Sequence, residues 1–305
     1  GSYTKYIDTA NDVNPLYRAQ NYAREITNNS YRVNIFLELK PFKGFNYRLN
    51  TSFYNRQQED GEVKGVNYPG GGATAKLTNN EQRNYLIENT YEVPIKKQQH
   101  KLTLTAVQSV DHSQTKGLGY ATSDLPVDMD WDFISNGQFS GTPTRTFSEN
   151  NLVSFMGRAS YIFMDRYIMN VAIRRDGSSR FGKNNKWGTF PAVGVAWTAS
   201  NEEFMKNIKA ISYLKLKASW GKNGNQSLSP YETLSKITLG QSGGYSYSFG
   251  NTSLVSWGQR ITSMGNTDLG WEETESFNYG FDLGVLDNRI RLEFDGYFSK
   301  TTNQI

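Results

Sequence analysis

The sequence predicts an all-β protein, and more narrowly an antiparallel up-and-down transmembrane β-barrel of about ten strands. Three observations predict this fold class. Apolar and polar side chains alternate along many segments, with the two-residue period of a β-strand. Many of these segments reach about ten residues, whereas strands of soluble proteins average about 5–6 and a strand that crosses a bilayer needs about 9–11. The connections between them alternate between short and long.

The alternating segments come in pairs, and a short break joins the two members of each pair. Residues 31–40 show the pattern, with Tyr31, Val33 and Ile35 on one face and mostly polar side chains on the other. We expect hairpins between 31–40 and 45–54, 83–93 and 100–110, 151–163 and 167–176, 188–199 and 211–221, and 275–286 and 289–300.

The lengths of the connections sort by position along the chain. The first kind is short and comprises 41–44, 94–99, 164–166, 200–210 and 287–288. The second kind is longer and comprises 55–82, 111–150, 177–187 and 222–274. Outer-membrane barrels have short periplasmic turns and long extracellular loops, so each kind should occupy one rim. Within 200–210, Ser200 and Glu203 form a capping-box pattern that predicts a helix of about two turns; the alternative is an irregular turn.

Because lipid cannot satisfy polar groups, we expect the apolar face of each strand to point outward and the polar face to line a lumen. The outward set is Val33, Ile35, Leu37, Leu102, Leu104, Tyr167, Met169, Val171, Phe281, Leu283, Leu292 and Phe294. The lumen set is Arg32, Glu38, Arg48, Arg174, Lys215, Arg291 and Glu293.

A tight barrel of about ten strands would fill with apolar side chains, not with charged ones. We therefore expect an incomplete arc of a wider barrel, with unpaired edges near 31–40 and 289–300. The expected organisation is one partial transmembrane β-barrel domain, residues 1–305, without a plug or a signal peptide.

The composition excludes several classes of protein. Aromatic residues make up 14% of the chain, which does not suit a disordered protein. The chain has no cysteine, which excludes disulfides, thiolate catalysis and zinc–sulfur sites. The net charge of +4 is too small to indicate a nucleic-acid partner, and no apolar run is long enough for a transmembrane helix. A soluble all-β carbohydrate-binding module of a surface protein and a β-rich glycoside hydrolase remain as alternatives.

Three segments carry a resemblance to a known family. They are 174–182 with its continuation to 191, 214–225, and 269–272 with the strand that follows. Together they resemble the barrel of SusC/RagA-family TonB-dependent outer-membrane transporters, although Thr267 stands where that family more often has proline. The resemblance implies a barrel of about 22 strands in the outer membrane of a Bacteroidetes-type bacterium.

The same resemblance implies cargo and partners. The cargo would be oligosaccharides or peptides. A SusD-like surface lipoprotein would act as a lid, and the TonB complex would supply energy through an N-terminal part that this sequence does not contain. The family resemblance implies transport. We expect no enzymatic activity, because the sequence offers little support for a catalytic site.

Asp128, Asp130 and Trp131, in the fourth connection, are candidates for contact with substrate or with a lid. Their alternating carboxylates resemble the start of a calcium loop, but an EF-hand needs Gly at its sixth position and Glu at its twelfth. Phe133 and Phe139 occupy those positions, so that motif fails. A looser calcium site in this extracellular loop or a solvated acidic loop remains. Trp131 either stacks on a sugar ring or packs against a neighbouring loop.

The long connection 222–274 supplies three further contact candidates, Tyr245, Tyr247 and Trp257. Aromatic residues interleaved with Gly and Ser suit an adaptable contact surface. The alternative is a β-extension above the membrane that packs on adjacent loops.

The segment 174–182 allows two interpretations. Arg180 with a Gly-Ser turn suits anion binding. The alternative, which we favour, is a tight loop in which Gly177 and Gly182 provide positive φ angles. Catalysis has little support, because the two histidines, His100 and His112, are predicted at opposite ends of the barrel.

Overall fold

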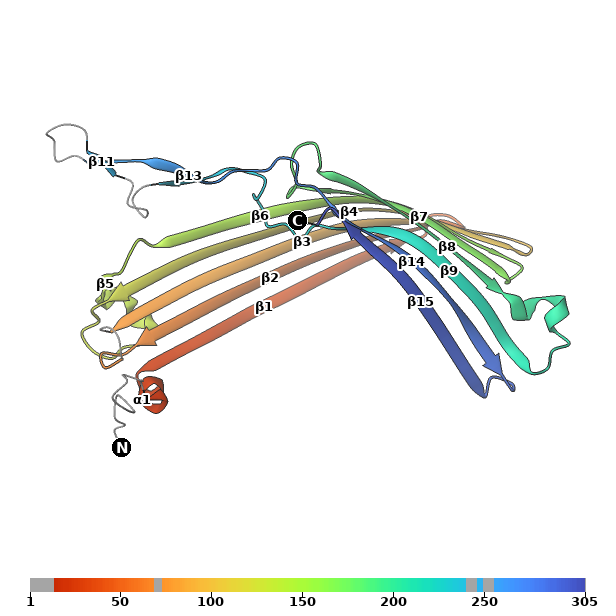
Figure 1. The fold of residues 1–305 in the computed structure, drawn as a ribbon, viewed down its shortest axis with the longest axis horizontal. Helices are drawn as coiled ribbons and strands as arrows, with labels where there is room; N and C mark the ends of the chain where they lie inside the picture. Colours follow the sequence, from red (N-terminus) through yellow and green to blue (C-terminus); the bar gives the residue numbers. More distant parts are fainter. Residues whose placement is uncertain (1–13, 69–72, 240–245, 249–254, 305) are drawn as a thin grey trace. The chain divides into compact units, whose positions relative to one another are not determined.

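The computed structural model describes residues 14–68, 73–239, 246–248 and 255–304. Its long strands are β1 (Tyr22–Leu39), β2 (Asn46–Lys64), β3 (Thr74–Lys97), β4 (His100–Ser123), β6 (Thr144–Phe163), β7 (Tyr167–Ser178), β8 (Trp187–Thr198), β9 (Ile211–Asn225), β14 (Glu272–Val285) and β15 (Ile290–Thr302). They form one sheet in the order β1-β2-β3-β4-β6-β7-β8-β9-β14-β15 (Figure 1). Every neighbour is therefore the next long strand in the chain, which confirms the up-and-down topology.

The short elements lie in the connections. They are α1 (Pro15–Gln20), β5 (Gln138–Phe139), β10 (Lys236–Leu239), β11 (Ser246–Ser248), β12 (Val255–Trp257), β13 (Gln259–Ser263) and the 3-10 turns η1 (Trp131–Asn136), η2 (Ala199–Asn201) and η3 (Glu203–Met205). Strand β5 pairs with β4, and two small hairpins pair β10 with β13 and β11 with β12. In the described part of the chain, no helix is long and apolar enough to cross a membrane.

The first and last long strands, β1 and β15, occupy the two ends of the sheet order. Among the described residues they do not pair with each other, so a barrel closed by these ten strands does not form. This confirms the predicted pair of edges near 31–40 and 289–300.

Two of the predicted long connections are mostly strand. β2 ends at Lys64 and β3 begins at Thr74, so the loop between them is much shorter than the predicted 55–82. β4 ends at Ser123 and β6 begins at Thr144, so the connection between them is much shorter than the predicted 111–150. Sequence alternation fades there because both faces of these extensions carry polar side chains, as over 111–117.

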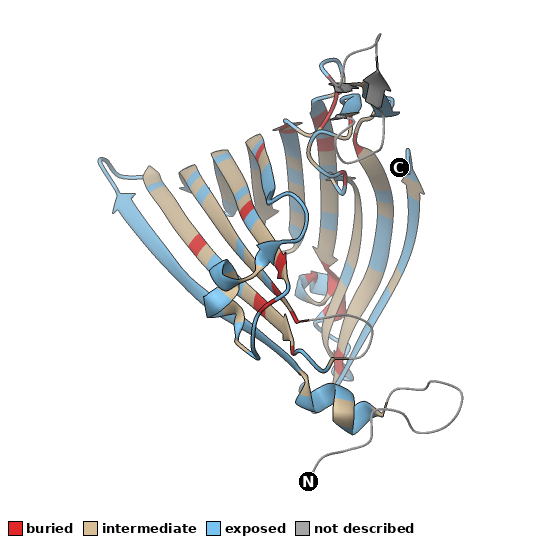
Figure 2. Ribbon diagram, turned by 90° about the vertical axis from the view of Figure 1, so that its left-hand side faces the viewer, coloured by how far each residue is buried: buried red, intermediate tan, exposed pale blue. Residues whose placement is uncertain are grey.

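The chain divides into two compact units, which we describe separately. The first comprises 1–35, 52–85 and 112–149, and the second comprises 36–51, 86–111 and 150–305. Among the described residues, each unit has a small cluster of buried apolar side chains, and buried positions are few along the strands (Figure 2). In the first unit the group is Ala73, Ala75 and Leu125. In the second unit it is Phe181, Phe190, Leu228 and Trp271.

The second unit contains all five short connections, and they share one rim. A Cβ at Gly44 would lie 3.9 Å from the Pro94 oxygen. Backbone hydrogen bonds join Gln99 to Met164, Arg166 to Thr198, and Ala210 to Leu286. The predicted grouping of short connections is confirmed for this unit.

The strand register of the second unit separates an apolar from a polar face. Phe281 lies opposite Phe294, and their rings stack with centroids 5.6 Å apart. Asp282 lies opposite Glu293 at the next position and therefore on the other face. Most of the predicted outward set is exposed, and none of it is buried in a closed core.

Candidate functional site

The polar face of β9, β14 and β15 carries a four-residue charge cluster around Lys217. The Lys217 ammonium lies 3.0 Å from a carboxylate oxygen of Asp282, 2.8 Å from Glu293 and 2.9 Å from Asp295. One residue comes from β9, one from β14 and two from β15. The cluster carries three negative charges against one positive charge. The Lys217 ammonium thus links β9 to β14 and β15 on the polar face.

A second polar group lies on β6 and β7. Arg174 donates through Nε to the Asp176 carboxylate at 2.8 Å and through Nη2 to the Ser154 hydroxyl at 2.9 Å. Arg174 lies opposite Met156, and Ser154 and Asp176 are each two positions further along their strands, so these side chains lie on one face of the sheet. The apolar Phe155 and Ile173 lie on the other face. The strands of the second unit thus form a sheet with one polar face and one apolar face.

The Arg180 guanidinium donates hydrogen bonds to oxygen atoms of the protein itself. Its Nη1 donates to the backbone oxygens of Gln226 at 3.2 Å and Leu228 at 2.9 Å, and its Nη2 donates to Asn150 Oδ1 at 3.3 Å. The guanidinium therefore ties the connection between β7 and β8 to the start of the long connection after β9. This arrangement favours the structural interpretation of the segment over anion binding.

Ring packing supports the same junction. Phe181 is 2% exposed, and its ring centroid lies 4.9 Å from that of Trp271. Phe190 meets Trp271 edge-on at 5.3 Å, and the Trp271 indole N–H donates to the Lys186 carbonyl at 3.1 Å. The motif residues of 174–191 and 269–272 thus form one cluster that fixes the base of the loops.

The prediction that Gly177 and Gly182 provide positive φ angles is wrong. Neither Gly177 nor Gly182 has a positive φ; the described glycines with positive φ are Gly44 and Gly141. A Cβ at Gly177 would lie 2.9 Å from the Trp187 ring, and a Cβ at Gly182 would overlap the backbone oxygen of Thr267. The reason for glycine is close approach of neighbouring groups and not a left-handed backbone.

Asp128, Asp130 and Trp131 are engaged within the first unit. Asp128 Oδ1 accepts from the Val66 backbone N–H at 2.7 Å, and Asp130 caps η1 by accepting from the Asp132 N–H at 3.1 Å. The Trp131 ring covers Gly61, where any Cβ would overlap it. The packing interpretation of Trp131 therefore holds. Among the described residues, no group of three or more His, Asp or Glu stands close enough to hold a metal ion.

The other contact candidates lie in the long connection. Tyr245 lies outside the described residues. The backbone of Tyr247 pairs with Ser256 in the β11–β12 hairpin, and that of Trp257 pairs with Ser246. The predicted β-extension is thus present in this connection.

The histidines have structural neighbours. His100 Nδ1 lies 2.7 Å from the Tyr161 hydroxyl, and its ring stacks on Phe163 at 4.8 Å. His112 lies 6.1 Å from the Tyr85 ring.

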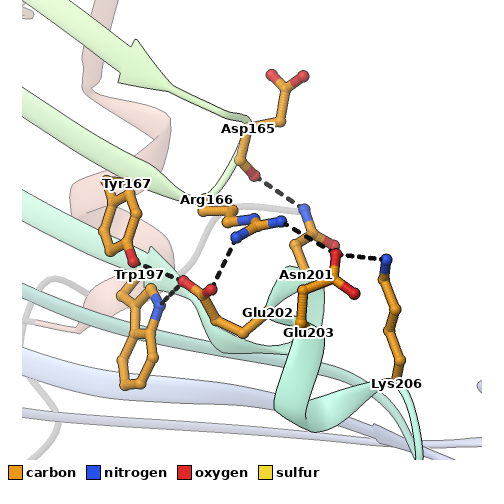
Figure 3. Close-up of polar contacts among 8 residues, drawn as sticks. All are labelled: Asp165, Arg166, Tyr167, Trp197, Asn201, Glu202, Glu203 and Lys206. Carbon is orange, nitrogen blue, oxygen red and sulfur yellow. Dashed lines mark hydrogen bonds and ion pairs between the residues drawn. The ribbon is translucent and has the colours of Figure 1, made fainter. Parts of the chain in front are cut away.

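Two of the short connections, 164–166 and 200–210, meet at Glu202 (Figure 3). Its Oε1 accepts from the Tyr167 hydroxyl at 2.6 Å and from the Trp197 indole N–H at 3.1 Å, and its Oε2 accepts from Arg166 at 2.8 Å. The hydrogen bond from Tyr167, followed by that from Trp197, lowers the pKa of Glu202. The residue is 9% exposed, so a buried carboxylate pins the turn between β8 and β9 to the turn between β6 and β7.

The predicted capping box is wrong. Residues 199–205 form two 3-10 turns, neither with a side-chain cap, and Ser200 Oγ is buried without a partner among the described residues. Glu203 pairs with Lys206 at 2.6 Å and lies 3.7 Å from Arg166 (Figure 3). The adjacent Glu202 draws the chain toward the strands, so an ordinary helix does not form.

The comparisons with known proteins identify the family. The family described as TonB dependent receptor-like, beta-barrel matches residues 1–305. The chain belongs to this family. TonB-dependent receptor P3 of Formosa agariphila is 31% identical over 99% of the chain, and TonB-dependent receptor SusC of Bacteroides thetaiotaomicron is 37% identical over 50% of it.

This TonB-dependent receptor barrel spans about a third of its relatives' length or less: it covers 30% of the Formosa protein and 15% of SusC. In fold it is similar to a chain of the structure titled RagAB peptide transporter, with a TM-score of 0.86 and 24% identity over 97% of this chain and 33% of that one. The all-β barrel fold and the family resemblance are both confirmed.

The sequence analysis did not identify two residues of this TonB-dependent receptor barrel on which several polar contacts converge, Glu202 and Lys217. Glu202 meets Tyr167 across 35 positions, and Lys217 meets Glu293 across 76. Strand parity places Lys217 on the polar face, but only the register of three strands shows that its partners converge.

Proposed function

We propose that this chain is part of the barrel wall of a TonB-dependent nutrient transporter in the bacterial outer membrane, which imports oligosaccharides or peptides. The observation that carries the proposal is the division of the second unit's strands into an apolar and a charged face. Such a division suits a wall between lipid and a water-filled path. Membership of the TonB-dependent receptor barrel family and the similarity to SusC and RagAB support it.

The proposed partners follow from the same relatives. We propose a SusD-like lipoprotein as a lid over the extracellular loops and the TonB complex as the source of energy, acting through parts of the protein outside this sequence. The cargo is a hydroxyl-rich oligosaccharide or a peptide, since both can hydrogen-bond to mixed charged and amide side chains along the polar face. This part of the chain requires no cofactor and has no catalytic role in the proposal.

The alternative of a soluble carbohydrate-binding module is disfavoured by the exposed apolar face. Ile35, Ile173 and Leu292 are all more than half exposed on strands that have no second layer among the described residues. A soluble module would bury such a face against another sheet or a helix.

The proposal is tested with the whole protein in its native host. We expect the protein in the outer-membrane fraction and expect uptake of a labelled oligosaccharide or a labelled peptide to stop when its gene or TonB is removed. A native protein that stays soluble without detergent would contradict the proposal, as would uptake of both cargo classes that is unaffected by either deletion.

A further inference from the structure

The apolar face of the second unit has a groove of about 460 Å³ close to the rim of short connections. It spans four neighbouring strands, β6 to β9, and its side chains on that face include Tyr161, Tyr167, Met169, Trp197, Leu216 and Ala218. Tyr167 lies opposite Trp197 and Trp197 opposite Leu216, so these three form the row nearest the rim. In the next row, Met169 and Ala218 both lie opposite Val195, and the small Ala218 leaves room beside its neighbours.

The polar tips at the rim end of the groove are held by the protein. The Tyr167 hydroxyl and the Trp197 indole N–H both donate to Glu202 Oε1, at 2.6 and 3.1 Å (Figure 3). The exposed Phe204 ring lies 6.4 Å from the Trp197 ring and continues the apolar surface beyond the end of β8. Rings with an apolar body and a bonded polar tip suit the level where hydrocarbon meets lipid head groups.

Exposed apolar side chains recur along the whole rim. They are Phe42, Ile95, Met164, Phe204, Ile208 and Leu286. In the first four short connections a basic residue follows each of them within two positions: Lys43, Lys96, Arg166, Lys206 and Lys209. Such pairs suit a bilayer interface, because the apolar side chain enters the acyl region while the basic one reaches the head groups.

The ion pairs beside the groove leave basic charge in surplus. Each acidic side chain there has a basic partner: Asp165 has Lys101, Glu202 has Arg166 and Glu203 has Lys206. Among the described residues, Lys209 forms no ion pair, and neither do Lys96 and Lys97. The mouth of an apolar groove therefore carries net positive charge, which attracts anionic lipid.

We propose that this groove binds an anionic phospholipid of the leaflet on the side of the short connections. One acyl chain lies between Trp197 and Ala218, and the phosphate lies beside the 200–210 connection. The inference rests on the proposed outer-membrane location and names a ligand other than the transported cargo. The volume is within the range of about 300–1,000 Å³ that is typical of small-ligand sites. A free phosphate would leave the groove unfilled, and a lipid without net charge would leave the surplus lysines without a partner.

The test uses the whole protein, purified from outer membranes in mild detergent and stripped of lipid. Native mass spectrometry measures binding of phosphatidylglycerol and of phosphatidylcholine with the same two oleoyl chains, so that the lipids differ only in their head groups. We expect phosphatidylglycerol to bind about tenfold more tightly. Lys206→Gln/Lys209→Gln should remove most of this preference. Ala218→Trp fills the groove and should weaken binding of both lipids about tenfold.

Each variant has a matched control in the same unit. Lys183→Gln/Lys186→Gln removes two exposed lysines with the same spacing from the connection between β7 and β8, which is not one of the short connections. Ala159→Trp adds the same ring on the apolar face, opposite Val171 and outside the groove. We expect both controls to bind the two lipids like the wild type.

Several results overturn the inference. They are equal affinity of the wild type for the two lipids, full preference in the Lys206→Gln/Lys209→Gln variant, and unchanged binding of both lipids in Ala218→Trp. The same losses in the controls also overturn it. Displacement of phosphatidylglycerol by an equal concentration of glycerol 3-phosphate assigns the lysines to a free phosphate, and an adduct with the mass of a protein assigns the rim to a protein partner. Either result refutes the lipid site.

The outcome separates from that of the proposed function. A protein that fractionates with the outer membrane and supports uptake, but whose lipid binding is insensitive to the groove and lysine variants, refutes the phospholipid site alone. A protein absent from the outer membrane refutes the proposed function as well.

Discussion

Replacement of Phe181 by alanine should release the long connection after β9 from the sheet. Phe181 is 2% exposed and packs on Trp271, Phe190 and Leu228, so the substitution empties the centre of the small apolar cluster of the second unit. Truncation of a buried phenylalanine costs about 3–5 kcal/mol. The cluster lies near the protein surface and can partly collapse, so we take the lower end, about 3 kcal/mol.

That free energy sets the size of the effect on loop opening. At about 1.4 kcal/mol per factor of ten, a loss of about 3 kcal/mol raises the opening equilibrium about 150-fold. The assay is hydrogen–deuterium exchange of the whole protein in detergent, followed at the amides of β9 beyond Lys222 and at the Gly182 amide, which donates to the Leu269 carbonyl. These amides should exchange about two orders of magnitude faster in the variant, while β7 and β8 keep their protection.

Phe204→Ala is the matched control, because Phe204 is 62% exposed on the rim of short connections. It loses the same atoms but little burial, so exchange of the long connection should be unchanged. If Phe181→Ala leaves exchange at the wild-type rate, the cluster does not hold the loop base, and the structural account of the motif fails. Uniform unfolding of all strands would equally refute a local role.

Three further predictions concern other parts of the molecule. Gly182→Ala should loosen the same loop base, because its Cβ would overlap a backbone oxygen of the long connection. Gly157→Ala should be tolerated, because its Cβ would meet only one methyl group, at 4.0 Å. Limited proteolysis of the long connection compares the two variants. Because the pKa of Glu202 is lowered in the fold, its contribution to stability is complete above about pH 4.5 and is lost as the pH falls below that value; exchange of the rim turns should rise in acid, and Glu202→Gln should flatten the pH dependence. Lys217→Met leaves three carboxylates facing one another and should speed exchange at β14 and β15, and a second change, Asp295→Asn, should partly restore protection.

The sequence predicted the ten long strands, their order and their two faces, because a strand with one apolar and one polar face carries a two-residue period. It underestimated strand length where that asymmetry ends. Residues 111–117 have no large apolar side chain on either face, so no alternation marks them, yet β4 continues through them to Ser123. Backbone pairing with neighbouring strands, which leaves no pattern in the side chains, extends the sheet there.

The sites were less predictable, for a different reason. Ser200 and Glu203 match a capping pattern, but Tyr167, Trp197 and Arg166 all converge on the intervening Glu202. Partners far away in the sequence outweigh a local propensity worth about 1 kcal/mol. Trp131 shows the same limit, since only the structure shows that its ring covers Gly61.

The open ends of the sheet bear on how this wall can stand in a membrane. Among the described residues, β1 and β15 each pair with one neighbour, so each presents a row of backbone N–H and C=O groups on its other side. In hydrocarbon an unsatisfied backbone group costs several kcal/mol, and a strand of a dozen or more residues carries several of them on each edge. No cluster described above offsets such a cost. In the proposed outer-membrane location, further strands must therefore pair with both edges, and relatives about three times as long have the residues to supply them.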